Sequence, residues 1–174
     1  MAENKLSRCR IETPLGEMVA VARGGALVML EFAYRRKFDR QEAAVHRHTD
    51  AEIKDGAAPV FDQVRLELEE YFHGTRKAFT IPLDFLGTPF QIEVWEYLAR
   101  IPFGQTATYG QIAQFMGRKE LTRAVGRANG DNRLAIVVPC HRVIAADGDL
   151  CGYAGGLGRK QWLLALESGQ PALL

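Results

Sequence analysis

A thiol, an imidazole and a guanidinium stand side by side in the stretch AIVVPCHRVIAADG, residues 135–148. Pro139 disfavours regular strand pairing, so we expect a turn in which the adjacent side chains of Cys140 and His141 can converge. A thiol becomes a useful nucleophile when a base or a positive charge lowers its pKa, and His141, Arg142 or a helix N-terminus could each do so. The alternative is that Cys140 is a small buried hydrophobic residue within an apolar run.

A third group is needed to hold the imidazole, and Glu167 is the candidate. It lies in RKQWLLALESG, residues 159–169, beside apolar side chains, where an unpaired carboxylate would be costly to bury. A glutamate near the end of a helix can equally face water. A Cys-His-Glu relay and a solvated acid therefore both remain open from these residues.

Three helices are expected in the second half of the chain. The first is PFQIEVWEYLARI, residues 89–101, whose apolar residues recur at helical spacing. The second is TYGQIAQFMG, with Thr108 as N-cap and Gly117 as C-cap, and the third is LTRAVGRANG, residues 121–130. The tight connection between the second and third predicts a helix-turn-helix, in which the third helix enters a DNA groove, although any helical hairpin has this pattern.

Basic residues are concentrated around the third helix. Residues 118–142 contain six basic and two acidic side chains, a net charge of +4 in a chain whose total is +1. The basic residues are Arg118, Lys119, Arg123, Arg127, Arg133 and Arg142. They are placed to contact phosphates, or they form an ordinary solvated basic face.

The first half of the chain has a different pattern. Short apolar runs separated by turn signals predict two or three antiparallel strands in residues 10–33. Residues 35–58 are polar and fit a solvated helix or a loop, and residues 59–74 fit an amphipathic helix closed by Gly74. Two prolines and a glycine mark residues 79–90 as a linker.

Composition limits the class of protein. The 174 residues are 47% hydrophobic and 25% charged, as in an ordinary soluble protein. The polar N-terminus and the absence of a long apolar segment predict a cytoplasmic protein that does not enter a membrane. Three cysteines at spacings that match no zinc pattern predict thiols in a reducing compartment, with Cys151 packed in the structure. We expect no cofactor and no metal; the imaginable zinc ligands, which lack a recognisable pattern, are Cys9, His46, His48 and His73.

Three separated segments carry a family resemblance. Pro139 to Val143, TRAVGRAN at residues 122–129 and GYAGGLGRKQWLLALE at residues 152–167 resemble the O6-alkylguanine-DNA alkyltransferases. The resemblance is close from Thr88 to Glu167 and one of general shape before residue 85. It implies an α+β fold, with an N-terminal ribonuclease-H-like antiparallel sheet with helices in residues 1–85. Residues 86–174 would then form a mostly helical winged helix-turn-helix domain. No fused regulator domain is recognised in the sequence, so the resemblance implies the stand-alone repair form.

The resemblance implies a single-turnover repair reaction without a cofactor. An O6-alkylated guanine would rotate out of double-stranded DNA, and its alkyl group would move irreversibly to Cys140; activity on O4-alkylthymine is left open. His141 would act as base through a water, and Glu167 would orient it. Asn132 would be a hinge between the third helix and the active-site turn, and Tyr109 would contact the flipped base and a phosphate.

The remaining assignments also rest on the resemblance. The groups around the flipped base would be Tyr109, Cys140, Val143, Tyr153 and Ala154. Many relatives have serine at position 154, and alanine keeps the backbone N–H. The DNA-contacting residues would be Tyr109, Gly110, Thr122, Arg123, Ala124, Gly126 and Arg127, with Arg123 filling the space left by the extruded base. We expect a monomer and leave open cooperative binding along DNA.

Two other classes of protein are weighed against this interpretation. A lesion sensor would bind alkylated DNA without transfer, but relatives of that kind replace the cysteine. A Cys-His-Glu hydrolase or a transcriptional regulator would share only the local patterns.

Overall fold

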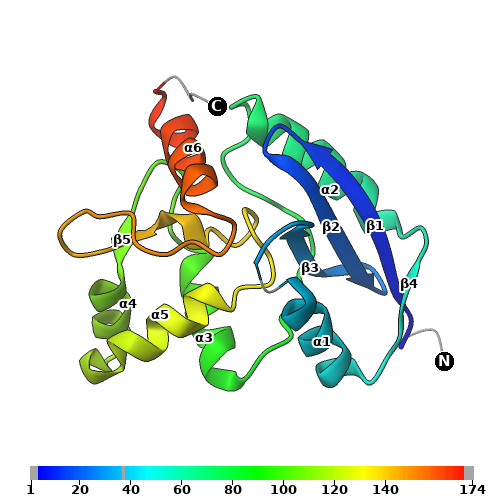
Figure 1. The fold of residues 1–174 in the computed structure, drawn as a ribbon, viewed down its shortest axis with the longest axis horizontal. Coiled ribbons are helices and arrows are strands. Elements are labelled where there is room, and N and C mark those ends of the chain that lie inside the picture. The colour runs from blue at the N-terminus through cyan, green and yellow to red at the C-terminus, as the bar shows by residue number, and fades with distance from the viewer. Residues whose placement is uncertain (1–3, 37, 171–174) are drawn as a thin grey trace. The chain divides into compact units, whose positions relative to one another are not determined.

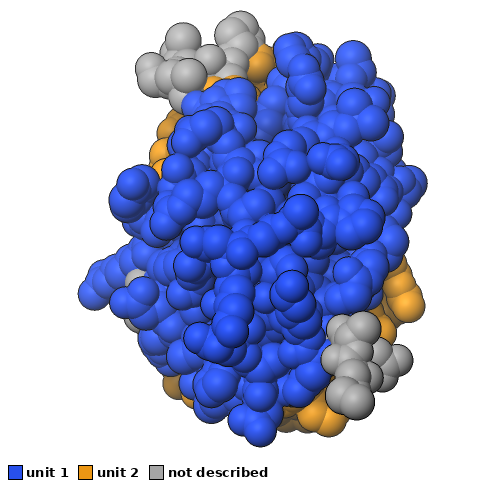
Figure 2. Space-filling view, turned by 90° about the vertical axis from the view of Figure 1, so that its right-hand side faces the viewer, with its two compact units in different colours: residues 1–86 blue, residues 87–174 orange. Residues whose placement is uncertain are grey.

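The computed structural model describes residues 4–36 and 38–170. The chain divides into two compact units, residues 1–86 and 87–174, which Figure 2 shows in different colours. The architecture is α+β, with the sheet in the first unit and most of the helix in the second, as the sequence predicts.

A four-stranded sheet organises the first unit (Figure 1). Strands β1 (Leu6–Thr13), β2 (Gly16–Arg23) and β3 (Ala26–Phe32) form an antiparallel meander. Its turns use glycines at positive φ, Gly16 at 112° and Gly24 at 57°, a conformation that side chains with a Cβ rarely adopt. The antiparallel prediction is confirmed. A fourth strand, β4 (Ile53–Asp55), pairs parallel with β1 and was not predicted, because three residues of mixed polarity carry no strand pattern.

Two helices accompany the sheet. Helix α1 (Phe38–Thr49) occupies the polar stretch for which the sequence left helix and loop open. Helix α2 (Pro59–Phe72) matches its prediction, with proline in its first turn and Gly74 at φ 74° just beyond its end. One buried cluster joins the sheet to α1 through Leu6, Val19, Val21, Val28, Met29, Val45, Ala51 and Leu86.

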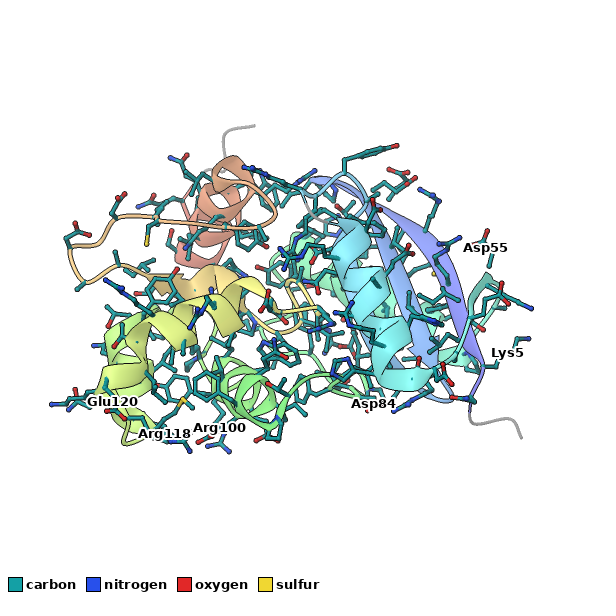
Figure 3. All side chains as sticks on the ribbon, turned by 60° about the horizontal axis from the view of Figure 1, so that its bottom comes forward. Lys5, Asp55, Asp84, Arg100, Arg118 and Glu120 are labelled. Atoms are coloured by element: carbon teal, nitrogen blue, oxygen red, sulfur yellow. The ribbon has the colours of Figure 1, made fainter. Side chains whose placement is uncertain are left out.

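The segment predicted as a linker is largely part of the first unit. Leu27 of β3 donates its N–H to Pro82 O at 2.8 Å and accepts from Asp84 N at 3.0 Å, so the segment adds a short parallel bridge beside β3. Ile81 and Leu86 are buried, and the Asp84 carboxylate, labelled in Figure 3, accepts from Arg23. The extent of the linker prediction is therefore wrong: the prolines mark a pinned edge segment, and the boundary between units falls after Leu86.

Helices dominate the second unit. They are α3 (Pro89–Leu98), α4 (Tyr109–Phe115), α5 (Thr122–Gly130) and α6 (Leu157–Ser168), with short 3-10 turns η1 (Lys119–Leu121) and η2 (Cys140–Arg142). Two short strands, β5 (Ala107–Thr108) and β6 (Val143–Ile144), pair in parallel. In Figure 1 the orange loop between β6 and α6 reaches out past β5 before it returns to α6.

The helix ends explain where α3 and α4 begin. Thr88 and Thr108 each accept a hydrogen bond from the backbone N–H of a glutamine three residues later, and each glutamine side chain returns to the cap N–H. Trp95 anchors α3 to α5 by donating its indole N–H to Ala128 O at 2.8 Å. The C-cap of α4 is Met116 rather than the predicted Gly117, which follows at φ 71°. No helix among the described residues is long and apolar enough to cross a membrane.

Candidate active site

Two tight turns lead the chain into Cys140. Val137 N donates to Ala135 O at 2.8 Å, and the residue between them, Ile136, has φ 72°. This is the rarer, strained form of γ-turn, and a β-branched residue seldom adopts it. Cys140 N then donates to Val138 O at 2.8 Å around Pro139 at φ −82° and ψ 64°, the common inverse γ-turn. The predicted interruption of the apolar run at Pro139 is confirmed.

Asn132 braces these turns from the end of α5. Its buried side chain donates to Val138 O at 2.9 Å and accepts from Leu134 N at 3.0 Å. The carboxamide therefore satisfies backbone groups on both sides of the strained residue. This geometry connects α5 to the Cys140 turn, at the residue for which the family resemblance implies a hinge.

His141 and Glu167 are in direct contact. His141 Nε2 lies 2.7 Å from Glu167 Oε1, and both side chains are buried. Because a carboxylate only accepts, Nε2 must carry the proton and donate it. Nδ1 is then the basic nitrogen, and it has no hydrogen-bond partner among the described residues. The structure brings together the imidazole and acid proposed from the sequence, and the solvated alternative for Glu167 does not hold.

Arg142 completes this cluster in a way the sequence did not indicate. Its guanidinium donates from Nε to Glu167 Oε2 at 2.9 Å and from Nη2 to Oε1 at 2.8 Å. A further bond reaches Ile101 O at 2.5 Å. From the sequence, Arg142 was one of the groups that could lower the pKa of the Cys140 thiol. In the structure its charge is paired with Glu167.

The surroundings fix the charges of this cluster. Burial alone would raise the pKa of Glu167, but the hydrogen bonds from His141 and Arg142 outweigh it and bring the pKa to about 2. Burial lowers the pKa of His141 below its usual 6.5 despite the opposing hydrogen bond to Glu167, and the charges of Arg142 and Lys160 lower it further. At neutral pH the imidazole is therefore neutral and able to take a proton.

Tyr109, the first residue of α4, also lies at this site. Its hydroxyl donates to the carbonyl of Cys151 at 3.3 Å, and its ring is near Gly126, where an added Cβ would sit 3.7 Å away. Burial, with the neighbouring Cys151 and Cys140, raises the pKa of Tyr109 to about 12, so the hydroxyl stays protonated. The Cys151 side chain is exposed, which corrects the expectation that it packs in the interior.

Lys160 is the residue that sequence reasoning missed. Its side chain is 0% exposed, and Nζ donates to Val143 O at 2.6 Å and to Cys151 O at 3.2 Å. In the sequence it is one of two adjacent basic residues, Arg159 and Lys160, and residue type alone does not distinguish their environments. The only sequence feature that could have indicated its buried position is that this lysine lies one turn into a helix rich in apolar residues.

The segment between the Cys140 turn and α6 carries the remaining residues expected near a substrate. Val143 is buried directly after the cysteine turn, while Tyr153 and Ala154 are partly exposed. Gly148, Gly152 and Gly156 have φ of 85°, 54° and 97°, so this loop bends where other residues would be strained. A separate cavity of about 550 Å³ beside α6 is bordered by Glu167 and Trp162, and Cys140 does not line it.

The residues expected to contact DNA lie on α4 and α5. Gly110, Arg123 and Arg127 are exposed, and Thr122, Ala124 and Gly126 are partly exposed. Arg118 is paired with Glu93 at 3.1 Å; Figure 3 shows Arg118 and Glu120 at the connection between the two helices.

Two of the six clustered basic residues are not available to phosphates. Arg133 is buried, lies over the Trp95 ring at 5.2 Å and donates to Asp131 O. Arg142 is buried against Glu167. The charge count from the sequence therefore overstated the basic surface. A run of adjacent residues does not distinguish exposed cations from buried ones.

The three histidines among the imaginable zinc ligands instead donate hydrogen bonds to backbone carbonyls. Nδ1 of His46, His48 and His73 donates to Ala51 O, Ala44 O and Glu69 O respectively. Among the residues that the structure describes, no three side chains of the ligating types are grouped to hold a metal.

Comparison with known proteins places the chain in a family. Residues 9–85 match the ribonuclease-like domain of 6-O-methylguanine DNA methyltransferase, and residues 89–169 match its DNA binding domain. A methylated-DNA–protein-cysteine methyltransferase of Mycobacterium tuberculosis (strain H37Rv) is 41% identical over 160 residues, 90% of this chain and 89% of the relative. A constitutive one of Bacillus subtilis (strain 168) is 40% identical over 90% of this chain and 92% of its own length.

Solved structures agree with this placement. The crystal structure of Mycobacterium tuberculosis OGT in complex with DNA is similar with a TM-score of 0.81 and 39% identity, over 95% of this chain and 96% of that one. The methyltransferase of Pyrococcus kodakaraensis gives a TM-score of 0.65 at 28% identity, over 93% and 98%. The chain belongs to the 6-O-methylguanine DNA methyltransferase family. Its enzyme class is that of the methylated-DNA–protein-cysteine methyltransferases.

Proposed function

We propose that this protein repairs double-stranded DNA by moving the alkyl group of O6-alkylguanine to Sγ of Cys140 in one irreversible turnover. The observation that carries the proposal is the buried contact of 2.7 Å between His141 and Glu167, beside a cysteine in a braced turn. Family membership supports the reaction class, and the site supplies residues suited to it.

The reaction requires three functions from the chain. His141 takes the thiol proton at Nδ1, through a water, while Glu167 fixes the tautomer by accepting from Nε2. The Cys140 thiolate then attacks the alkyl carbon in line, forming an S–C bond as the C–O6 bond breaks. The electron pair moves to the guanine, whose developing charge is stabilised by the protonated hydroxyl of Tyr109 and by backbone N–H groups in residues 153–154.

The same chemistry makes the protein single-use. The product is a thioether, and water does not readily cleave a C–S bond of this kind. The protein is therefore consumed by the reaction.

The target base must leave the duplex before the thiol can reach it. Extrusion costs a few kcal/mol, which pocket contacts and a replacing side chain offset. Arg123 is exposed near the start of α5 and is proposed to fill the space. Gly110, Thr122, Ala124, Gly126 and Arg127 would surround it on the DNA side, and Val143, Tyr153 and Ala154 would line the base pocket.

Several expectations from the sequence stay proposals. They are domain limits of 1–85 and 86–174, a cytoplasmic location, a monomeric protein, some activity on O4-alkylthymine and cooperative binding along DNA. None of them is needed for the transfer step.

Stoichiometry tests the proposal. A duplex carrying one O6-methylguanine is titrated with the protein, and repaired guanine is counted after the reaction has stopped. We expect the repaired amount to equal the amount of active protein. Repeated turnover would identify a Cys-His-Glu hydrolase, and binding without repair would identify a lesion sensor.

A further inference from the structure

Lys160 is a charged side chain with an unusual location. It is 0% exposed at the end of the first turn of α6, and its Nζ donates to Val143 O at 2.6 Å and Cys151 O at 3.2 Å. A buried ammonium is costly unless its protons are bonded, and two carbonyls supply those bonds here.

The two carbonyls belong to the two ends of one loop. Val143 directly follows the Cys140 turn, and Cys151 precedes the segment with Tyr153 and Ala154. The Cys151 carbonyl also accepts from Tyr109 OH at 3.3 Å. Lys160 therefore connects the turn that carries the thiol to the segment proposed to hold the base.

Neither of the other basic side chains near Cys140 supplies a free positive charge to its sulfur. Arg142 is paired with Glu167, and His141 is neutral at neutral pH because burial lowers its pKa. Lys160 forms no ion pair with a carboxylate among the described residues. Nζ binds the carbonyl of Val143, and the N–H of Val143 closes the turn by donating to Cys140 O, so the ammonium is held against the turn that carries the thiol. Burial lowers the pKa of Lys160, while charges on Cys151, Cys140 and Asp149 raise it. Because this interaction is mutual, the ammonium favours a thiolate at Cys140.

We propose that Lys160 is a positioning residue of the alkyl-acceptor site, whose ammonium ties Val143 to Cys151 and stabilises the thiolate of Cys140. This inference rests on the proposed function for its meaning in repair. The charge is lost when the thiolate becomes a thioether, so the stabilisation applies to the reacting form and not to the product.

The pH dependence of Cys140 alkylation by iodoacetamide tests the charge directly. The probe is small, uncharged and independent of DNA. Trypsin separates residues 134–142, which contain Cys140, from residues 143–159, which contain the exposed Cys151, so each thiol is followed by peptide mass. The full chain is compared with Lys160→Met, Lys160→Gln and Lys160→Arg. Arg159→Met is the control, because it removes one charge from a partly exposed neighbour on α6 that bonds Gly155 O instead.

We expect the Cys140 profile of the two neutral variants to move to higher pH by about one unit, which is about a tenfold slower reaction at pH values below the pKa of the thiol. Lys160→Arg should stay closer to the wild type, and Arg159→Met should coincide with it. Neutral variants that fold, by circular dichroism, and keep the wild-type profile would overturn the proposal. Lys160→Gln keeps an uncharged N–H donor group at this position. Its profile therefore tests the role of the charge if Lys160→Met does not fold.

Methyl transfer from O6-methylguanine DNA, measured on the same proteins, separates this inference from the proposed function. A wild-type protein that takes no methyl group but shows the iodoacetamide shift on loss of Lys160 would reject the repair function and keep the electrostatic role. A wild-type protein that repairs DNA while the profiles coincide would reject the role of Lys160 alone.

Discussion

Glu167 accepts hydrogen bonds from both His141 and Arg142 inside the protein. A carboxamide cannot balance the buried guanidinium, so Glu167→Gln leaves Arg142 charged and unmatched. We expect it to lower the free energy of unfolding by about 3–5 kcal/mol in urea titrations, the usual cost of removing one partner of a buried pair. Glu120→Gln at an exposed position is the control, and an equal effect of the two substitutions would contradict the buried pairing.

Acid should destabilise the protein in two stages. The folded pKa of His141 lies below its unfolded value of 6.5, so the unfolded chain binds this proton first and stability falls as pH drops below 6.5. The folded pKa of Glu167 is about 2 against 4.5 unfolded, so its contribution is present above 4.5 and is lost between those values. Each group contributes a slope of up to about 1.4 kcal/mol per pH unit.

Urea midpoints between pH 8 and pH 5 check the histidine stage. His141→Gln, whose amide can still donate to Glu167, should be less sensitive to pH in this window than the wild type. Identical pH dependence in the two proteins would show that His141 does not resist protonation in the folded state.

At the scale of elements, the Cys140 turn depends on α5 through Asn132. Asn132→Ala leaves Leu134 N without its side-chain acceptor inside the protein, which we expect to cost about 1–3 kcal/mol of unfolding free energy. The turn around Ile136 should also relax, so Cys140 should react more slowly with iodoacetamide. Asn129→Ala is a matched control, because Asn129 Oδ1 has no hydrogen bond among the described residues. Equal reactivity of Cys140 in the two variants would contradict the proposal that Asn132 holds the Cys140 turn in place.

The sequence predicts elements whose cause is local. The meander of the first unit follows from turn glycines, the capped start of α4 from Thr108, and the cysteine turn from Pro139. It does not predict β4, which is short and held by β1, or the strained φ of Ile136, which only the surrounding contacts maintain.

The same distinction applies to the site. His141 and Glu167 stand out by residue type in an apolar context, and the structure brings them together. The environments of Arg142 and Lys160 depend on burial by residues distant in the sequence, so charge alone placed Arg142 among phosphate-binding candidates.

At the scale of the whole molecule, the proposed DNA surface is smaller than the charge count implied. Arg127 is exposed on α5, and its replacement by alanine should reduce the slope of log affinity against log salt by about 1 for undamaged duplex. Arg100→Ala, at another exposed position labelled in Figure 3, should leave the slope unchanged. A larger change of slope for Arg100→Ala than for Arg127→Ala would contradict the placement of the DNA-binding surface on α5.

Arg123 should act differently from a phosphate contact. If it fills the space left by the extruded base, Arg123→Ala slows methyl transfer from duplex DNA while reaction with free O6-methylguanine is nearly unchanged. Rates measured by quenched-flow on both substrates give the comparison. Equal slowing on the two substrates would reject this role.

The most direct measurement of the central claim is the mass of residues 134–142 after the protein has met O6-methylguanine duplex. The account predicts that this peptide gains one methylene, on the sulfur of Cys140, and that the gain is absent in Cys140→Ser although that variant still binds DNA. A methyl group found on another peptide, or repaired DNA with an unmodified Cys140, would contradict it.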